Sequence, residues 1–228
     1  MERRDDGNYK SPGLCGGTLV ASKYVISAAH CMYNYNTDVE AISNKDPQDL
    51  VIIIGDHILF DDTDATPLPT RIINVRSYTN HPDYRQQFGI QPVIEDGYDI
   101  TILELEEELD MTIYTPACLA ESDDYTFFDG KAATVAGWGD LSEDGPMPDP
   151  LVPHSVDLRV IGANDCKWSR KWAPFQPSQQ DQRAPFHKAP RGFYHIRSIM
   201  CAGFPEGGKD ACKVSLWVSS FLIFKQKT

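Results

Sequence analysis

Much of what would point directly to a function is missing from the sequence. There is no CxxC pair, and the six cysteines are spread along the chain, which excludes a zinc ribbon or knuckle. The longest apolar run, at 215–224, is too short to span a membrane. Basic residues are few, because 21 Lys and Arg stand against 33 Asp and Glu, for a net charge of −12. This balance argues against nucleic acid or an anionic membrane as a partner of the whole surface.

The composition that is present suits an all-β protein. The 228 residues are enough for one large β domain or two small ones, and 41% of them are hydrophobic. The 16 glycines and 16 prolines are spread through the chain, as in a loop-rich fold. Cysteines without zinc spacing predict disulfides and therefore an extracellular protein. Residues 1–12 nevertheless lack the apolar segment of a secretory signal, so we expect the start of the chain to be missing or misassigned.

Short apolar runs bounded by turn residues predict many strands and little helix. Residues 16–29 predict two strands joined by a turn at Ser22-Lys23. Further strands are expected at 50–55, 71–78, 99–109, 131–139 and 156–161. The polar segments 32–49 and 79–98 predict loops, and only 162–171 shows any helical periodicity. This pattern predicts a β-barrel or a β-sandwich.

Four sequence boxes occur in an order typical of one family. The first, CGGTLVASKYVISAAHC at 15–31, places His30 at the end of a predicted strand and directly before a cysteine. It is followed by DITIL at 99–103, GWG at 137–139 and CAGFPEGGKDAC at 201–212. Together these boxes resemble the chymotrypsin/trypsin-like serine proteases (peptidase S1), and the resemblance extends with gaps over most of the chain.

The resemblance implies catalytic roles for two residues. ISAAHC is similar to the family's TAAHC box, which makes His30 the general base. DITIL is similar to the DIALL box, which makes Asp99 the carboxylate that fixes the tautomer of that base. Taken alone, His30 would be interpreted as a structural histidine and Asp99 as a turn-capping acid. The agreement of several boxes in one order favours the catalytic interpretation.

The GKDAC segment implies a substrate preference. By resemblance, Asp210 lies at the bottom of the specificity pocket, where a buried carboxylate pairs with a cationic side chain and is left uncompensated by a neutral one. The alternative is an exposed acid in a Lys-Asp turn. On the pocket interpretation, the expected partners are protein or peptide substrates with Lys or Arg, together with protease inhibitors.

The family pattern breaks after Cys212. The family continues with one residue and then GDSGGP, whereas this chain reads KVSLW. Leu216 therefore stands at the nucleophile position and Val214 at that of an oxyanion-hole glycine. Ser215 lies one residue early, and such a slip reverses side-chain direction in extended backbone. We expect this chain to be inactive, although the family consists of serine endopeptidases that act through an acyl-enzyme. The alternative is a non-catalytic homologue that binds or regulates other proteins.

The resemblance also implies a domain organisation. The parent fold is all-β, with two six-stranded antiparallel barrels and the catalytic residues between them. A single trypsin-like domain over 1–228 would comprise an atypical N-terminus (1–13), a first barrel (14–120), a partial second barrel (121–212) and a non-homologous tail (213–228). Missing strands would leave unpaired edges in the second barrel. Because Lys-Val-Ser at the start of the tail can be encoded as a consensus splice donor, we hypothesise that the tail is translated intron.

The family pattern further implies two disulfides, one between Cys15 and Cys31 and one between Cys166 and Cys201. Cys118 is similar to a cysteine that tethers an upstream region in the family. Cys212 normally pairs with a cysteine beyond the point of divergence. Cys118 and Cys212 are therefore expected to be left over.

No cofactor is expected, although two charged segments allow alternatives. The stretch 55–66 lies where some family members bind Ca²⁺, and it offers the oxygen ligands Asp56, Asp61, Asp62 and Asp64. Their spacing differs from that of the calcium-binding members, which favours a solvated acidic loop. Residues 167–197 carry seven basic residues against one aspartate. This segment is either an exosite for an anionic partner or a flexible inserted loop, and the inserted loop is the preferred interpretation.

Overall fold

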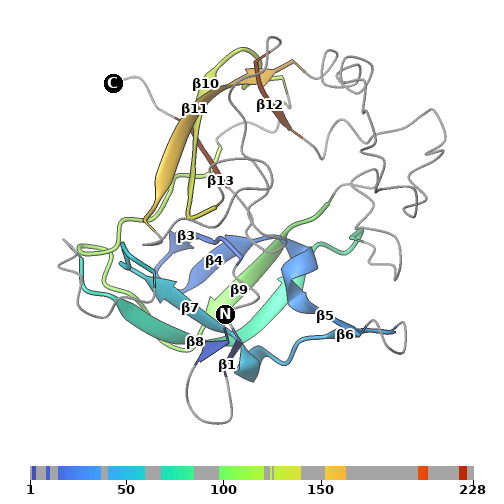
Figure 1. Ribbon diagram of the computed structural model, residues 1–228, viewed down its shortest axis with the longest axis vertical. Helices are drawn as coiled ribbons and strands as arrows, with labels where there is room; N and C mark the ends of the chain where they lie inside the picture. The colour runs from blue at the N-terminus through green and yellow to red at the C-terminus, as the bar shows by residue number, and fades with distance from the viewer. Residues whose placement is uncertain are drawn as a thin grey trace, which may run out of the picture.

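The computed structural model of the protein is almost entirely β-structure. It describes residues 2–3, 9–10, 15–36, 41–59, 68–84, 98–120, 124, 126–139, 152–162, 200–204 and 221–224. These residues form thirteen strands and two short 3-10 helices, with no α-helix among them. Most of the strands belong to two antiparallel sheets, which occupy the lower and upper halves of the molecule in Figure 1. The all-β prediction is confirmed.

Five strands form the first sheet in the order β3-β4-β9-β8-β7. Their bounds are Thr18–Ala21 (β3), Tyr24–Ser27 (β4), Val51–Ile54 (β7), Arg71–Asn80 (β8) and Thr101–Leu105 (β9). The predicted turn at Ser22 and Lys23 joins β3 to β4. β4 pairs with β9 so that Ser27 lies opposite Thr101. The residues that follow β4 and those that precede β9 therefore meet at one end of the sheet.

The inner face of this sheet carries the main hydrophobic core. Leu103 and Leu105 of β9 are buried in it. Ile100 and Ile102 lie on the opposite face and are 41% and 48% exposed. Residues from neighbouring elements complete the cluster: Val25, Ala28, Cys31, Met32, Leu50, Ile73, Val75, Leu109 and Tyr114. The core thus includes the residues that directly follow the histidine of the ISAAHC box.

The second sheet has four strands in the order β12-β11-β10-β13. Their bounds are Ala132–Gly137 (β10), His154–Ile161 (β11), Cys201–Gly203 (β12) and Phe221–Phe224 (β13). Alternate residues of β10 and β11 are buried: Ala133, Val135, Leu158 and Val160. Trp138 follows β10, and its indole Nε1–H donates a 3.0 Å hydrogen bond to the carbonyl oxygen of His57. This bond joins the second sheet to the segment that follows β7 in the first.

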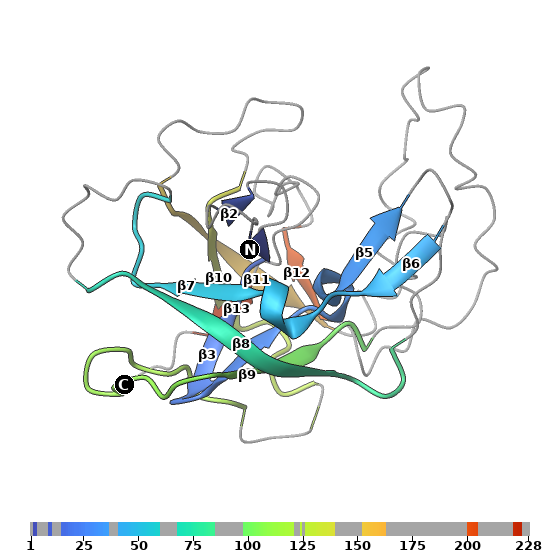
Figure 2. The same ribbon diagram turned by 90° about the horizontal axis from the view of Figure 1, so that it is seen from below.

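Two sequence predictions need correction. The segment 32–49 is not a loop, because β5 (Tyr33–Asn36) and β6 (Ala41–Asn44) form a hairpin followed by the 3-10 helix η2 (Pro47–Asp49). Figure 2 shows this hairpin projecting beyond the sheets. The predicted strand at 99–109 is shorter, since β9 ends at Leu105. The tail contributes β13, which lies antiparallel to β10 with Phe224 opposite Ala133.

Two small features complete the described structure. The short strands β1 (Glu2–Arg3) and β2 (Tyr9–Lys10) pair with each other. The possible helix at 162–171 lies outside the described residues except for Gly162, which has no regular structure. In the part of the chain that is described, no helix has the length and apolar character needed to cross a membrane.

Candidate active site

His30 lies in a tight turn at the end of β4. The 3-10 helix η1 (Ala29–Met32) begins two residues after the strand, and the Cys31 N–H donates to the Ala28 carbonyl at 3.2 Å. Ala28 and Ala29 are buried, and Ala29 has no exposed surface. Small side chains are required there because the turn packs directly on the core. The turn thus places the histidine ring at the edge of the sheet.

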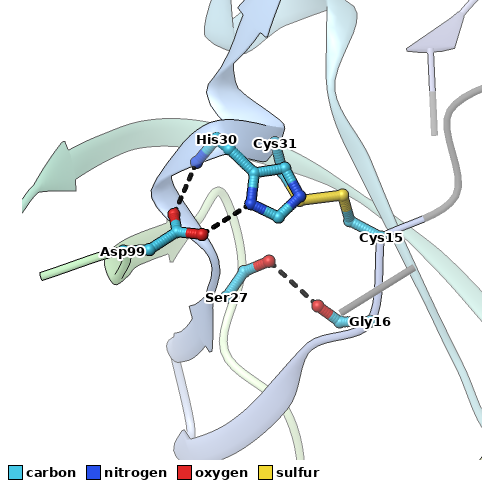
Figure 3. The surroundings of a disulfide bond; sticks show 6 residues. All are labelled: Cys15, Gly16, Ser27, His30, Cys31 and Asp99. Atoms are coloured by element: carbon cyan, nitrogen blue, oxygen red, sulfur yellow. Dashed lines mark hydrogen bonds and ion pairs between the residues drawn. A yellow bond between two sulfur atoms is a disulfide. The ribbon is translucent and has the colours of Figure 1, made fainter. Parts of the chain in front are cut away.

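A disulfide braces this turn. Cys15 and Cys31 are bonded, as the resemblance implied, with their Cα atoms 6.3 Å apart. Next to the disulfide, the Ser27 hydroxyl donates to the Gly16 carbonyl at 2.9 Å. A Cβ on Gly17 would lie only 2.8 Å from Val25 Cγ1, so the close approach of these two segments requires glycine. Figure 3 shows the disulfide and Ser27 beside the His30 ring.

Asp99 reaches His30 because of the strand register. It precedes β9, and β9 runs antiparallel to β4, which precedes His30. The Asp99 Oδ2 atom lies 2.7 Å from His30 Nδ1, and Oδ1 accepts a 2.8 Å hydrogen bond from the His30 backbone N–H. Both carboxylate oxygens therefore contact the same residue, 69 positions away in the sequence. This double contact fixes the carboxylate and the ring relative to each other (Figure 3).

The geometry determines which proton the imidazole carries. A carboxylate only accepts hydrogen bonds, so the bond to Asp99 places a proton on His30 Nδ1. In the neutral ring, Nε2 is then an unprotonated acceptor, and a proton taken up there would produce a cation next to the carboxylate. The side chains of His30 and Asp99 are 22% and 36% exposed, so the pair is accessible from outside. An imidazole with a fixed tautomer and an accessible acceptor nitrogen can act chemically as a general base.

The free side of the ring lies close to a sulfur. His30 Nε2 lies 3.6 Å from Cys31 Sγ, and among the described residues no hydroxyl is hydrogen bonded to Nε2. Cys15, His30 and Cys31 are close enough together to bind a metal ion. Metal binding requires thiolate sulfurs, however, and in the disulfide the two sulfurs are bonded to each other. In its oxidised form this group therefore has one metal ligand, the histidine.

The structure gives partial information on the other predicted site residues. Asp210, Leu216 and Val214 lie outside the described residues, as does the basic segment 167–197. Of the acidic residues considered for Ca²⁺, only Asp56 is described, and it is half-buried. Asp61, Asp62 and Asp64 are not among the described residues.

The remaining cysteines are partly accounted for. Cys201 forms a disulfide, whereas its predicted partner Cys166 lies outside the described residues. Cys118 is free and exposed, as predicted for a leftover cysteine. Cys212 is not described.

Sequence reasoning missed the residues that shape the backbone around Asp99. Tyr98 has a φ of 59° and is the one non-glycine residue with a positive φ in the described part of the chain. Its ring stacks on that of His81, with the ring centroids 4.6 Å apart. No sequence signal identifies this turn, because tyrosine is not a residue that favours positive φ.

The comparison with family models decides the family. The model described as Trypsin matches residues 6–214, which is most of the chain. The chain belongs to the trypsin family.

Relatives of known name agree with this assignment. The chain is 32% identical over 204 residues to the venom serine protease Bi-VSP of Bombus ignitus, a match that covers 87% of this chain and 45% of the relative. It is 28% identical over 205 residues to ovochymase-2 of Mus musculus, covering 90% of this chain and 27% of the relative. It is 29% identical over 203 residues to a trypsin of Saccharopolyspora erythraea, covering 88% of this chain and 66% of the relative. The chain thus spans less than half the length of the first two relatives.

A solved structure supports the fold. The chain is similar to neuropsin, a serine protease expressed in the limbic system of mouse brain, with a TM-score of 0.58 and 19% sequence identity. The match covers 92% of this chain and 71% of that structure. At this identity the likeness establishes the fold of the trypsin family for this chain and nothing about its activity.

Proposed function

We propose that this chain is derived from a serine endopeptidase that cleaves proteins after lysine or arginine, and that the chain as written does not catalyse the reaction. The observation that carries the proposal is the His30–Asp99 pair, whose 2.7 and 2.8 Å contacts give the imidazole the tautomer that a general base requires. The base would accept the proton of a serine hydroxyl as that hydroxyl attacks the peptide carbonyl. Asp99 would stabilise the resulting imidazolium by its negative charge.

The nucleophile is the missing part. In the register given by Cys212, Leu216 stands where the family has its serine, and a leucine side chain has no nucleophilic atom. Val214 stands in place of a glycine whose backbone contributes to the oxyanion hole. Loss of both groups would remove covalent catalysis and stabilisation of the tetrahedral intermediate together. We therefore assign to this chain the base and its carboxylate without the catalytic activity.

The proposed preference for Lys or Arg rests on Asp210. This aspartate lies two residues before Cys212, and a carboxylate at the bottom of the pocket would pair with the cationic side chain of the substrate. Protein substrates and protease inhibitors are the partners proposed on this basis. We propose an extracellular location, which is supported by the Cys15–Cys31 disulfide, because such bonds persist in oxidising compartments.

A second candidate function is a non-catalytic protein that binds other proteins. It is favoured by the position of β13, which belongs to the divergent tail and yet pairs with β10 over Ala133–Ala136. A tail that covers a sheet edge protects that edge from pairing with other chains. A tail that disrupted the fold would prevent the protein from accumulating. A divergent tail that fits the fold is therefore compatible with an inactive protein that accumulates.

One experiment tests the proposed inactivity, and a second separates the two candidate functions. The first treats the purified chain with a fluorophosphonate serine probe and an arginyl ester, with an active trypsin as the control. We expect no labelling and no hydrolysis above background, and stoichiometric labelling of any serine would contradict the proposed inactivity. The second sequences full-length cDNA across the Cys212 codon. A product that continues into GDSGGP supports the protease origin, and this product should hydrolyse arginyl esters and lose the activity in His30→Ala. A dominant message that ends in the present tail supports the binding protein.

A further inference from the structure

We infer that His81 and Tyr98 are positioning residues for the catalytic pair, because their stacked rings hold the backbone turn that directs the Asp99 carboxylate at His30. The inference rests on the proposed role of Asp99 as the carboxylate partner of a base. Neither His81 nor Tyr98 is assigned as a catalytic residue.

Asp99 occupies the centre of a very tight turn. The Ile100 N–H donates to the Tyr98 carbonyl at 2.7 Å, which closes a three-residue turn with Asp99 in the middle. The residue before it, Tyr98, has a φ of 59°. A left-handed backbone is unfavourable for a residue with a Cβ, and aromatic residues rarely adopt it. Such a conformation persists only where the surrounding structure holds it in place.

His81 contacts this turn on both sides of Asp99. Its ring stacks on the Tyr98 ring at a centroid distance of 4.6 Å and an interplanar angle of 16°. Its backbone N–H donates to the Ile100 carbonyl at 2.9 Å. The stack therefore holds the residue before Asp99, and the hydrogen bond holds the residue after it. Asp99 is left with little freedom except to present its carboxylate to His30.

His81 is itself fixed by the segment that follows β8. The Asp83 N–H donates to His81 Nδ1 at 3.1 Å, which orients the ring, and the Tyr84 N–H donates to the His81 carbonyl at 3.0 Å. Tyr84 is buried, and its ring contacts that of Tyr33 with centroids 6.0 Å apart. The anchor therefore extends from the hydrophobic interior through His81 to Tyr98. The stacked His81 ring, fixed in this way, can hold Tyr98 in its unfavourable backbone conformation.

The test is the exchange behaviour of the proton in the His30–Asp99 hydrogen bond. Proton NMR on the chain labelled with ¹⁵N-histidine detects the Nδ1–H of His30, and His30→Gln identifies the signal by its loss. In His81→Ala, which removes the stacked ring, we expect this proton to exchange with water about tenfold faster. Tyr98→Gly should have the same effect, because glycine tolerates the positive φ while the ring is lost. Tyr98→Gly therefore provides the same test if His81→Ala does not fold.

A conservative variant separates positioning from general stability. Tyr98→Phe keeps a stacking ring and leaves the hydrogen bond from Asp83 to His81 Nδ1 in place, so exchange at His30 should stay within about twofold of the unsubstituted chain. Phe127→Ala, which removes an exposed ring that contacts Phe128 and Lys131 in the turn before β10, is the control and should change nothing. Unchanged exchange in a folded His81→Ala or Tyr98→Gly would overturn the inference. Absence of the His30 Nδ1–H signal in the unsubstituted chain would instead overturn the His30–Asp99 pair, and with it the proposed function.

Discussion

Asp99 uses both of its carboxylate oxygens on a single residue, since Oδ2 contacts the His30 ring at 2.7 Å and Oδ1 accepts from the His30 backbone N–H at 2.8 Å. The ring contact alone would leave the carboxylate free to rotate about its side-chain bonds. The backbone contact removes that freedom and ties the aspartate to the same turn that carries the imidazole. The tautomer of His30 therefore depends on the two accepting oxygens of residue 99 more than on the size of that side chain.

Asp99→Asn tests this dependence. An amide has one accepting oxygen, so it can satisfy either the His30 backbone N–H or the ring Nδ1–H, but not both. If the oxygen stays on the backbone N–H, the amide NH₂ faces the ring, and we expect the proton to move from Nδ1 to Nε2. The ¹⁵N chemical shifts of the two ring nitrogens report the tautomer directly. A variant that kept its proton on Nδ1 would show that Asp99 does not select the tautomer.

The disulfide offers a second prediction with a matched control inside the chain. Cys15 and Cys31 are 16 residues apart, and a cross-link of this length stabilises a protein by about 3 kcal/mol, mainly by restricting the unfolded chain. The double variant Cys15→Ala/Cys31→Ala should therefore lower the free energy of unfolding in urea by about 3 kcal/mol. Cys118→Ala removes a free, exposed cysteine and should leave this free energy unchanged. Equal effects of the two changes would contradict the predicted role of the disulfide.

The two faces of β9 should respond very differently to truncation. Leu105 has no exposed surface, and removing its side chain leaves a cavity in the core. Leu105→Ala should cost about 2–5 kcal/mol of unfolding free energy. Ile102 is 48% exposed on the same strand, so Ile102→Ala should cost about 0.5 kcal/mol or less. Thermal and urea unfolding measure both variants, and a large loss for Ile102→Ala would indicate that its face is covered.

The same strand shows what the sequence could and could not predict. The apolar residues of DITIL identify a strand, and the order of the boxes identifies its neighbourhood, so the strand that follows Asp99 is predictable. Which face is buried is not, because Ile100 and Ile102 alternate with the equally apolar Leu103 and Leu105. The register with β4 decides it, and that register depends on contacts far apart in the sequence.

The β5–β6 hairpin and the turn at Tyr98 could not be predicted from the sequence for a different reason. The two strands of the β5–β6 hairpin, YNYN and AISN, are only four residues long, so periodicity did not distinguish them from the polar loop around them. Long-range contacts hold it instead: the Asn80 side chain donates to the Tyr33 hydroxyl at 3.2 Å, and Tyr33 packs near Tyr84. Likewise the positive φ of Tyr98 has no signal in the residue itself, because tyrosine rarely adopts this conformation.

Tyr78 makes the pH dependence of stability testable. Its hydroxyl donates to the Lys45 carbonyl at 2.9 Å and lies 3.4 Å from the Met32 carbonyl, next to the turn that carries His30. Burial, with smaller contributions from Tyr33 and Asp46, raises the pKa of Tyr78 above the ordinary tyrosine value. The folded state therefore holds this proton more tightly than the unfolded state does. The stabilisation is complete below the unfolded-state pKa and is lost as the pH rises from there through the folded-state pKa.

Tyr78→Phe should remove this alkaline component. At neutral pH the variant should be less stable by about 1 kcal/mol, because the hydroxyl no longer satisfies the Lys45 carbonyl. Above the ordinary tyrosine pKa, the difference between the two chains should shrink as the pH rises, since only the chain with the phenol loses a stabilising proton. Urea unfolding at a series of alkaline pH values measures the difference, and Tyr24→Phe, which alters an exposed tyrosine, controls for the loss of one phenol. A difference that stayed constant with pH would mean that the pKa of Tyr78 is the same in the folded and unfolded chains.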